Sequence, residues 1–364
     1  MSFQRVLLLL FVIAYSLLTR AAAQEASQLA PAQINDIEKA ITAFMAQAHA
    51  PSISVAVVKD GKLAWTGAYG FSDLENFVPA TTSTMYRLAS ISKPITATAV
   101  MQLVQAGKID LDAPAQKYCP AYPQKQWTIT TRELLGHLAG VRHYKNPEEE
   151  NKSTHHYSSV VDSLDFFKSE PLDLEPGTKF HYSTFGYSIL GCEIEGVSGM
   201  SFMDYLQKNI FQPAGMTHIR SDDTYAIIPN RARGYRKTEN GDVVNAYLAD
   251  TSNKIPGGGL ISTATDLADF AIASMHATLV AKATEEQMWT PQKTRDGKST
   301  SYGLGWGIGE LKGKRKIAHD GGQPGTSTDL AMLPDSDVAV AVMCNLEEVR
   351  TRDLADEILE EIAP

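Results

Sequence analysis

The chain has 364 residues, of which 43% are hydrophobic, and its formal charge at neutral pH is −9. Such a length fits one large domain or two intertwined ones with a sizeable apolar core. The acidity, together with the lack of a basic stripe, heptad run or internal repeat, argues against a nucleic acid or an anionic membrane surface as partner.

Residues 1–23 have the features of a secretory signal peptide. Arg5 supplies a basic start, residues 6–18 form an apolar run, and Ala21-Ala22-Ala23 offers a small-residue cleavage site. An N-terminal membrane anchor is the alternative, but spanning a bilayer needs ~20 apolar residues. No cysteine follows the run to carry a lipid. Cleavage would remove Arg5 and Arg20 and no acid, taking the charge from −9 to −11. We expect an exported protein, periplasmic or secreted, without a stable membrane span.

The mature chain begins with a helix and a hairpin. Apolar residues at helical spacing predict an amphipathic helix from Pro31 to His49, which Pro51 ends. Two β-rich runs, Ile53 to Val58 and Lys62 to Tyr69, then flank an Asp-Gly pair, which is typical of a tight hairpin turn.

The stretch Ser90-Ile91-Ser92-Lys93-Pro94 precedes a helix-like run, Ile95 to Ala106, that Gly107 closes. If the helix starts near Ser90, the Ser90 and Lys93 side chains are neighbours on one face, because residues three apart lie one turn apart. A hydroxyl and an amine held together in this way can form a nucleophile and its base. One S-x-x-K match in a chain of this length is expected by chance, so other features must support the assignment.

Helices dominate the predicted middle of the chain. Thr130 and Glu133 form a capping box ahead of three leucines, and Gly140 is the expected stop of that helix. Further helical runs are expected at Phe185 to Val197, Ser201 to Phe211 and Asp266 to Met275, the last preceded by Gly257-Gly258-Gly259.

The C-terminal part returns to strands. Four short strands are expected, at Tyr302 to Glu310, Lys314 to His319, Thr326 to Leu333 and Val338 to Asn345, followed by an amphipathic helix that uses Leu354, Ile358, Leu359 and Ile362. These patterns predict an α+β fold, an α/β sandwich, in which N- and C-terminal strands form one antiparallel sheet flanked by helices, with a large, mostly helical insertion.

We therefore expect a single domain at 24–364, with a sheet subdomain at about 31–88 and 290–364 and a helical subdomain at about 89–289. A site would lie at the seam between the two, because pockets often form at such boundaries.

Two further motifs supply what a serine nucleophile needs. A lysine with an ordinary pKa of about 10.4 is protonated at neutral pH, so Lys93 needs a desolvated site or a nearby cation to act as a base. Alternatively, Tyr182 takes the proton as a tyrosinate beside the lysine. Later, His319-Asp320-Gly321-Gly322 ends a strand, and its glycines would let a substrate approach a backbone N–H that stabilises an oxyanion.

The remaining reactive residues suggest no metal or redox role. At most one disulfide can form from Cys119, Cys192 and Cys344, and Cys344 ends a run that reads as a buried strand. The pair His155-His156 and the cluster Glu148-Glu149-Glu150 are interpreted as solvated loops rather than metal sites.

Taken together and in this order, the motifs resemble the penicillin-recognising serine hydrolases, which include class C β-lactamases, D,D-carboxypeptidases, D-aminopeptidases and esterases with the β-lactamase fold. The resemblance extends from about Ile34 to Asn345. It also rests on Tyr86-Arg87-Leu88-Ala89-Ser90, Leu134-Leu135-Gly136-His137-Leu138-Ala139-Gly140, Pro176-Gly177-Thr178-Lys179-Phe180-His181-Tyr182-Ser183, Gly257-Gly258-Gly259-Leu260-Ile261-Ser262-Thr263 and Tyr302-Gly303-Leu304-Gly305-Trp306-Gly307.

The resemblance implies roles for individual residues. Ser90 would be the acylated nucleophile, Lys93 its close partner and Tyr182 the general base, although the residues alone leave open whether Lys93 or Tyr182 takes the proton. The N–H groups of Ser90 and Gly322 would form the oxyanion hole. The substrate would lie along a strand in which His319-Asp320-Gly321 corresponds to Lys-Thr-Gly of the β-lactamases. No metal or organic cofactor is implied.

Two positions depart from the family pattern. Thr184 stands where the family often has an asparagine that contacts the substrate amide. Asp320 replaces a Thr or Ser whose hydroxyl helps to hold the β-lactam carboxylate. If Asp320 faced the cleft, an anionic substrate group would meet a like charge, whereas strand alternation would turn it away.

The main hypothesis is therefore an exported serine hydrolase that cleaves an ester, amide or peptide bond of a small molecule through a Ser90 acyl-enzyme, closer to an esterase or peptidase than to a resistance enzyme. A true β-lactamase or D,D-carboxypeptidase is the alternative within the same class. A non-catalytic penicillin-binding sensor or scaffold is the alternative of another class.

Overall fold

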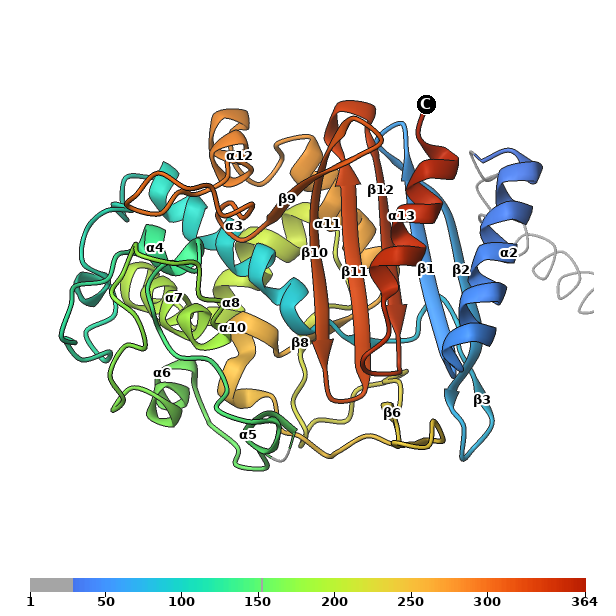
Figure 1. Cartoon of the computed structure of the whole chain (residues 1–364), viewed down its shortest axis with the longest axis horizontal. Helices are drawn as coiled ribbons and strands as arrows, with labels where there is room; N and C mark the ends of the chain where they lie inside the picture. The colour runs from blue at the N-terminus through green and yellow to red at the C-terminus, as the bar shows by residue number, and fades with distance from the viewer. Residues whose placement is uncertain (1–28, 152) are drawn as a thin grey trace, which may run out of the picture.

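The computed structural model describes residues 29–151 and 153–364, so the predicted signal peptide lies outside the described residues. Its centre is a seven-stranded sheet in the order β3-β2-β1-β12-β11-β10-β9, whose paired strands are all antiparallel (Figure 1). The strands are β1 (Ser52–Lys59), β2 (Lys62–Asp73), β3 (Val78–Pro79), β9 (Gly307–Leu311), β10 (Lys314–Gln323), β11 (Thr326–Leu333) and β12 (Val338–Cys344).

The N- and C-terminal parts of the chain meet at the β1–β12 pair, in which Val55 lies opposite Val342. The predicted hairpin is confirmed, because β1 and β2 are joined at Asp60 and Gly61, with φ of 50° and 67°. Two successive positive φ angles are what a two-residue hairpin turn requires, and Asp and Gly adopt them readily. The expected antiparallel sheet from both ends of the chain is thus confirmed.

Helices cover both faces of this sheet. On one face lie α2 (Pro31–Ala48), which packs against β1 and α13, and α13 (Thr351–Ile362), which packs against β11 and β12; on the other lies α11 (Ala264–Met275), which faces β1 and β12. Strand alternation separates the two cores: Val340 and Val342 face α2 and α13, while Ala341 and Met343 join the larger core on the opposite side.

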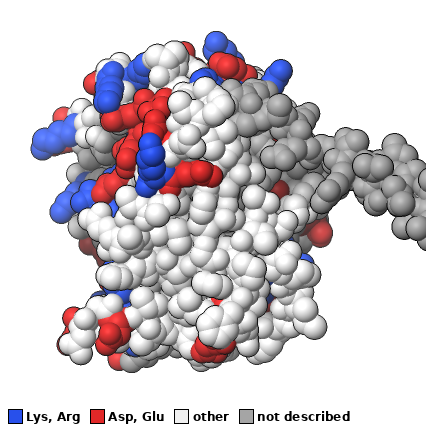
Figure 2. All heavy atoms as spheres, turned by 90° about the vertical axis from the view of Figure 1, so that its right-hand side faces the viewer, with Lys and Arg blue, Asp and Glu red and all other residues white. Residues whose placement is uncertain are grey.

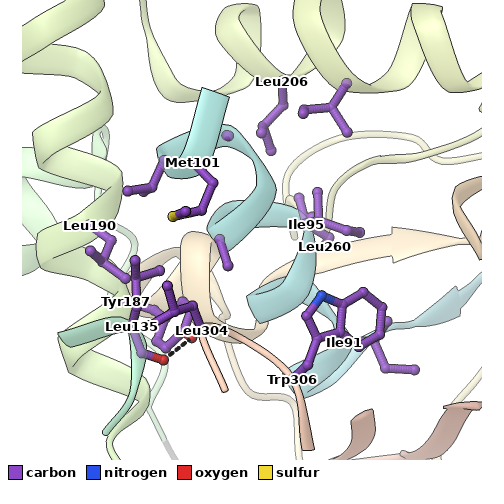
Figure 3. Close-up of a cluster of buried hydrophobic side chains, with 14 of the residues drawn as sticks. Ile91, Ile95, Met101, Leu135, Tyr187, Leu190, Leu206, Leu260, Leu304 and Trp306 are labelled. Carbon is purple, nitrogen blue, oxygen red and sulfur yellow. Dashed lines mark hydrogen bonds between the residues drawn. The ribbon is translucent and has the colours of Figure 1, made fainter. Parts of the chain in front are cut away.

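The helical region packs around α3 (Ser92–Gln105), most of whose side chains are buried on every side. Figure 3 shows Ile95 and Met101 of α3 among apolar side chains from α7, from the Leu304–Trp306 segment and from β8. The other helices of the described region are α4 (Thr131–Leu135), α5 (Pro147–Asn151), α6 (Val160–Ser163), α7 (Thr184–Ser198), α8 (Phe202–Leu206), α9 (Gln212–Ala214), α10 (Ile255–Gly258) and α12 (Lys282–Met288), with a π-helical turn at Gln207–Phe211.

Several expected boundaries were wrong. The segment 302–306 is not a strand, because β9 begins only at Gly307. The capping box of Thr130 and Glu133 is confirmed, but α4 ends at Leu135 rather than near Gly140. The acidic cluster at Glu148 lies in the short helix α5 and not in a loop.

The middle of the chain also holds short strands that the pattern did not predict. A three-stranded sheet pairs β4 (Tyr86–Arg87), β8 (Leu260–Ser262) and β5 (Arg220–Ser221), and a two-stranded one pairs β6 (Tyr235–Lys237) with β7 (Val243–Asn245). They are two or three residues long, too short for an alternating pattern to be recognisable. The division into subdomains stays a prediction.

Cys119 and Cys192 form a disulfide across 73 residues of sequence, between the segment after η2 (Ala115–Lys117) and α7. Cys344 is free and buried in β12, as predicted for a core residue, and burial raises its pKa to about 12. Over the described residues, we find no helix with the length and apolarity needed to cross a membrane. Figure 2, which shows the face bearing α2, has charges of both signs in its upper part and few charges elsewhere.

Candidate active site

The Ser90 side chain lies at the junction between the β4 segment and α3. It sits in a single 3₁₀ turn, η1 (Ala89–Ile91), which leads directly into α3 at Ser92. The preceding residue, Ala89, has a φ of 48°, which is uncommon for a residue with a Cβ. Such strain persists only where the surroundings hold it, and it is concentrated at functional sites. The helical turn thus begins near Ser90, as predicted, and Ser90 and Lys93 meet.

Lys93 is completely buried and lies against Ser90. Its Nζ is 3.0 Å from Ser90 Oγ, 2.6 Å from the carbonyl oxygen of Gly257 in α10, and 3.3 Å from Thr184 Oγ1 at the start of α7. The amine also lies over the Tyr182 ring, 4.8 Å from its centre. Segments far apart in the sequence therefore fix this nitrogen beside the hydroxyl.

Burial lowers the pKa of Lys93 well below its ordinary value, because the charged ammonium loses its hydration. The positive charge of Lys254 lowers it further, while Glu150 and Asp320 act in the opposite direction. From the sequence, we expect Lys93 to need a desolvated site or a nearby cation in order to act as a base. The structure contains both, because Lys93 is buried and Lys254 supplies the cation.

Tyr182 also belongs to this cluster. Its phenol lines the same cleft as Ser90, and its ring packs on the buried His137 with 4.2 Å between ring centres. Burial raises the pKa of Tyr182 above its ordinary value, and the neighbouring Ser90 offsets this only in part. At neutral pH Tyr182 is thus a neutral phenol, which disfavours the tyrosinate considered as an alternative base.

His319 lies on β10 opposite this cluster and is almost fully buried. Its Nδ1 is 2.7 Å from the carbonyl oxygen of Asp320, so this nitrogen carries the proton; its Nε2 lies 2.8 Å from the phenol oxygen of Tyr302 and accepts from it. Burial and the nearby Lys93 lower the pKa of His319 to about 4. At neutral pH, His319 is therefore an uncharged imidazole.

The direction of Asp320, which the sequence left open, follows the alternation of β10. Neighbouring His319 is buried toward the helical region, whereas Asp320 is exposed and points to the α13 side of the sheet. There its Oδ1 lies 2.9 Å from Nη2 of Arg352. The charge of Asp320 is thus matched by a guanidinium, and both residues border the cleft that Ser90 lines.

Gly321 and Gly322 differ in their surroundings. A Cβ on Gly321 would lie 2.4 Å from the carbonyl oxygen of Leu88 and 2.3 Å from Thr328 Oγ1, so only glycine lets β10 pass this close to the residues before Ser90. A Cβ on Gly322 would meet nothing within 4 Å, and Gly322 borders the open cleft.

Two neighbouring clefts meet at this strand edge. Ser90, Tyr182, Tyr302, His319 and Gly322 are among the residues that line the first, of about 530 Å³. The second, of about 720 Å³, lies between the end of β10 and the start of α5, and its lining includes Gly321, Gly322, Gln323, Glu150 and Glu347. Asp320, Gly322 and Arg352 border both. The structure thus brings Ser90, Lys93, Tyr182 and the His319–Gly322 strand together.

Thr184, expected to contact substrate, uses its hydroxyl on Lys93 and is almost fully buried. Its substrate-binding role stays a prediction. Within residues 29–151 and 153–364, no three His, Cys, Asp or Glu side chains are grouped so as to hold a metal ion. Of the His155-His156 pair, His156 bonds through Nδ1 to Asp250, 2.9 Å away.

Sequence reasoning did not assign roles to four residues of this neighbourhood: His137, Lys254, Tyr302 and Arg352. The motif phrases that contain His137 and Tyr302 were noticed, but nothing in a phrase shows that one ring packs on Tyr182 and the other bonds to His319. Lys254 stands three positions before Gly257, the first residue of the glycine run, and Arg352 lies on a helix that the apolar pattern alone had identified. The place of each of these four residues in the site depends on contacts between segments that are far apart in the sequence.

Comparisons with known proteins agree with this geometry. The model of the family described as Beta-lactamase matches residues 37–363. The human protein "Serine beta-lactamase-like protein LACTB, mitochondrial" is 30% identical to this chain, over 82% of the chain and 74% of the human protein.

Solved structures are similar in fold as well. An octameric penicillin-binding protein homologue from Pyrococcus abyssi superposes with a TM-score of 0.77 at 26% identity, covering 90% of this chain and 76% of that one. A D-stereospecific amidohydrolase from Streptomyces sp. gives a TM-score of 0.75 at 25% identity, covering 89% of this chain and 97% of that one.

Proposed function

Because this chain belongs to the Beta-lactamase family and is a serine hydrolase, we propose that it cleaves an ester or amide bond of a small molecule through an acyl-enzyme on Ser90. The observation that carries this proposal is the position of a fully buried amine, Lys93 Nζ, at 3.0 Å from Ser90 Oγ. A lysine in such surroundings is a competent base at neutral pH.

Lys93 is the group that takes the proton from Ser90. A neutral amine has two N–H donors and one lone pair. The two donors match the oxygens of Gly257 and Thr184, which leaves the lone pair to accept the hydroxyl hydrogen of Ser90. All three contacts are then satisfied in the uncharged state that the lowered pKa of Lys93 favours.

Acylation then follows in two steps. Ser90 Oγ bonds to the substrate carbonyl carbon while its proton moves to Lys93, and the negative charge on the carbonyl oxygen is stabilised by the N–H groups of Ser90 and Gly322. The bond to the leaving group breaks as that group receives the proton from Lys93, with the neutral phenol of Tyr182 beside Ser90 as relay. Water, activated by the same amine, releases the acyl group.

The charges around the cleft favour substrates without a carboxylate beside the scissile bond. At the position of the family's strand lysine, His319 is uncharged, and the guanidinium of Arg352 is already paired with Asp320. This supports an esterase, amidase or peptidase rather than an enzyme that grips a β-lactam carboxylate. One relative with a similar structure is by name a D-stereospecific amidohydrolase, so we propose D-aminoacyl amides as a substrate class to test first.

We further propose that the chain is exported, with residues 1–23 as its signal peptide. The disulfide between Cys119 and Cys192 supports this, because disulfides persist in oxidising compartments. The human relative is mitochondrial by name. N-terminal sequencing of the protein recovered from the medium or the periplasm tests the proposal; an intact Met1 in a cytoplasmic fraction would contradict it.

The substrate proposal is tested by turnover of three probes: a p-nitrophenyl ester, a D-aminoacyl p-nitroanilide and a chromogenic cephalosporin, each with wild type and Ser90→Ala. We expect hydrolysis of the ester or the anilide by wild type alone. Hydrolysis of the cephalosporin only would favour the β-lactamase alternative. A stable penicillin adduct without turnover of any probe would favour the sensor, and equal rates for both proteins would refute a Ser90 mechanism.

A further inference from the structure

A second buried lysine lies beside the proposed catalytic pair. Lys254 immediately precedes α10, the helix whose Gly257 carbonyl accepts from Lys93, and only 3% of its surface is exposed. A lysine side chain buried to this degree loses most of the hydration of its charge, so its presence calls for an explanation.

Contacts connect Lys254 with the site through three aromatic rings. Its Nζ lies over the Tyr144 ring, 5.2 Å from the centre. The Tyr144 ring is 4.7 Å from the ring of His143, which in turn is 5.6 Å from that of Tyr182. Lys93 lies over the Tyr182 ring at 4.8 Å. The two amines therefore lie at the two ends of one row of packed rings.

Lys254 is charged when Lys93 is not. Burial lowers the pKa of Lys254 only to about 8, because the carboxylate of Glu150 raises it again. At pH 7 most molecules therefore carry an ammonium at Lys254. That charge is the largest electrostatic influence on Lys93, and it acts to lower the pKa of Lys93. A neighbouring cation is one of the ways in which proteins keep a lysine in its base form.

We propose that Lys254 is a positioning residue for catalysis: its buried ammonium, offset by Glu150 at the wall of the larger cleft, keeps Lys93 uncharged and ready to accept the Ser90 proton. The inference rests on the proposed function, in which Lys93 is the base. Because His319 on β10 is neutral, Lys254 provides the second amine of this site from the residue that precedes α10.

Other charged and titratable groups face the two amines. Around Lys93 these are Tyr182, Tyr187, His137, His143, His319, Asp320 and Glu150. Around Lys254 they are Tyr144, His143, Glu150, Arg87 and Asp222, the last two paired with each other at 2.7 Å. Burial lowers the pKa of His143 to about 3 and that of His319 to about 4, and it lowers the pKa of His137 well below its ordinary value. Between pH 5 and 8, the charges that act on Lys93 are therefore those of Lys254, Glu150 and Asp320.

The sign of the effect distinguishes two variants. Lys254→Met removes a positive charge, so the pKa of Lys93 should rise. The acidic limb of kcat/KM against pH should move upward by the same amount. Glu150→Gln removes a negative charge and should move the limb downward. Lys254→Arg keeps the charge and should leave the limb where it is.

Lysine labelled with ¹³C at Cε allows a test that does not depend on turnover. In the full mature protein, the Lys93 resonance is assigned by its loss in Lys93→Arg, and its titration midpoint is followed by NMR in wild type, Lys254→Met, Lys254→Arg and Glu150→Gln. We expect the midpoint to rise in Lys254→Met, to fall in Glu150→Gln and to stay unchanged in Lys254→Arg. An unchanged midpoint in Lys254→Met, or shifts of the same sign in Lys254→Met and Glu150→Gln, would overturn the inference.

The result separates the two proposals. Opposite midpoint shifts in a protein that hydrolyses no ester or amide would support the role of Lys254 and refute the proposed hydrolase. Turnover of an ester or amide, together with an unchanged Lys93 midpoint in Lys254→Met, would support the proposed hydrolase and refute the role of Lys254. If Lys254→Met does not fold, the Lys254 resonance of the wild type, assigned by its loss in Lys254→Arg, decides the matter, because a titration midpoint for Lys254 below that of Lys93 would overturn the inference.

Discussion

The carboxylate of Asp320 is paired with the guanidinium of Arg352, Oδ1 to Nη2, at 2.9 Å, at the border of the cleft that Ser90 lines. Asp320 belongs to β10, and Arg352 to the first turn of α13. The pair explains how an acidic residue can stand one position away from His319 without placing a free negative charge over Ser90. It also keeps Arg352 from acting as an unpaired anion-binding group.

Removal of this pair should therefore change substrate choice more than catalysis. In Asp320→Asn, Arg352 is released, and we expect faster hydrolysis of a carboxylate-bearing ester relative to its neutral counterpart. The neutral ester should be hydrolysed within about fivefold of wild type, because an exposed ion pair contributes at most about 1 kcal/mol. The measurement is kcat/KM for both esters. The double variant Asp320→Asn/Arg352→Ala is the control, in which the gain should disappear.

The two glycines of β10 should respond differently to a methyl group. Gly321→Ala forces a Cβ to within 2.4 Å of the Leu88 carbonyl oxygen, so β10 must move away from the nucleophile turn. We expect a loss of about 1–3 kcal/mol in the free energy of unfolding, together with a loss of activity. Gly322→Ala, where a Cβ meets nothing, should keep wild-type stability. Urea unfolding of both variants tests this, and equal stabilities would contradict it.

Tyr302 should matter through its bond to His319. Tyr302→Phe leaves the buried Nε2 of His319 without a donor, a change that typically costs about 1–3 kcal/mol. We expect about a tenfold fall in kcat/KM, since His319 lies on the strand that borders the cleft. The matched control is Tyr205→Phe, whose phenol donates to Gln102 at 3.3 Å in the helical region. That variant should lose stability without losing kcat/KM.

Asp329 should make stability depend on pH. It is fully buried opposite Asp320, neither carboxylate oxygen has a hydrogen-bond partner among the described residues, and burial raises its pKa to about 8. An unfolded aspartate has a pKa near 3.9, so the folded protein holds the proton while the unfolded chain loses it. Stability from this group is complete below about pH 4 and is lost as pH rises toward 8.

Asp329→Asn should therefore stabilise the protein at high pH and not at low pH. We expect a higher Tm than wild type at pH 8.5, with the difference shrinking toward zero near pH 4. Asp353→Asn, which removes an exposed carboxylate from α13, controls for the loss of one charge. A difference between Asp329→Asn and wild type that is the same at both pH values would refute the assignment.

The sequence predicted the parts of the fold that depend on periodicity. The amphipathic helices α2 and α13, the β1–β2 hairpin and the valine-rich β12 were recognisable because local spacing determines them. The short strands β4 and β8 were missed because two or three residues carry no period. The segment 302–306 was wrongly predicted to be a strand. Its apolar residues Leu304 and Trp306 are instead buried in the helical core.

The motif residues of the candidate site were recognisable from the sequence, but their protonation states were not. Ser90, Lys93 and Tyr182 are recognisable by motif and order. Whether Lys93 or Tyr182 is suited to be the base depends on burial and on the charge of Lys254, which is distant in sequence. Likewise, strand alternation allowed Asp320 to face either side, and only its pairing with Arg352 from α13 determines the direction.

The central claim is that Ser90 is a nucleophile activated by Lys93, and the most direct measurement is intact and peptide mass spectrometry after exposure to a fluorophosphonate. We predict one phosphonyl adduct per wild-type chain, located on the peptide that contains Ser90. Ser90→Ala should gain none, and Lys93→Ala should be labelled at least about 10²-fold more slowly. A wild-type protein that stays unmodified, or an adduct that persists in Ser90→Ala, would contradict the account.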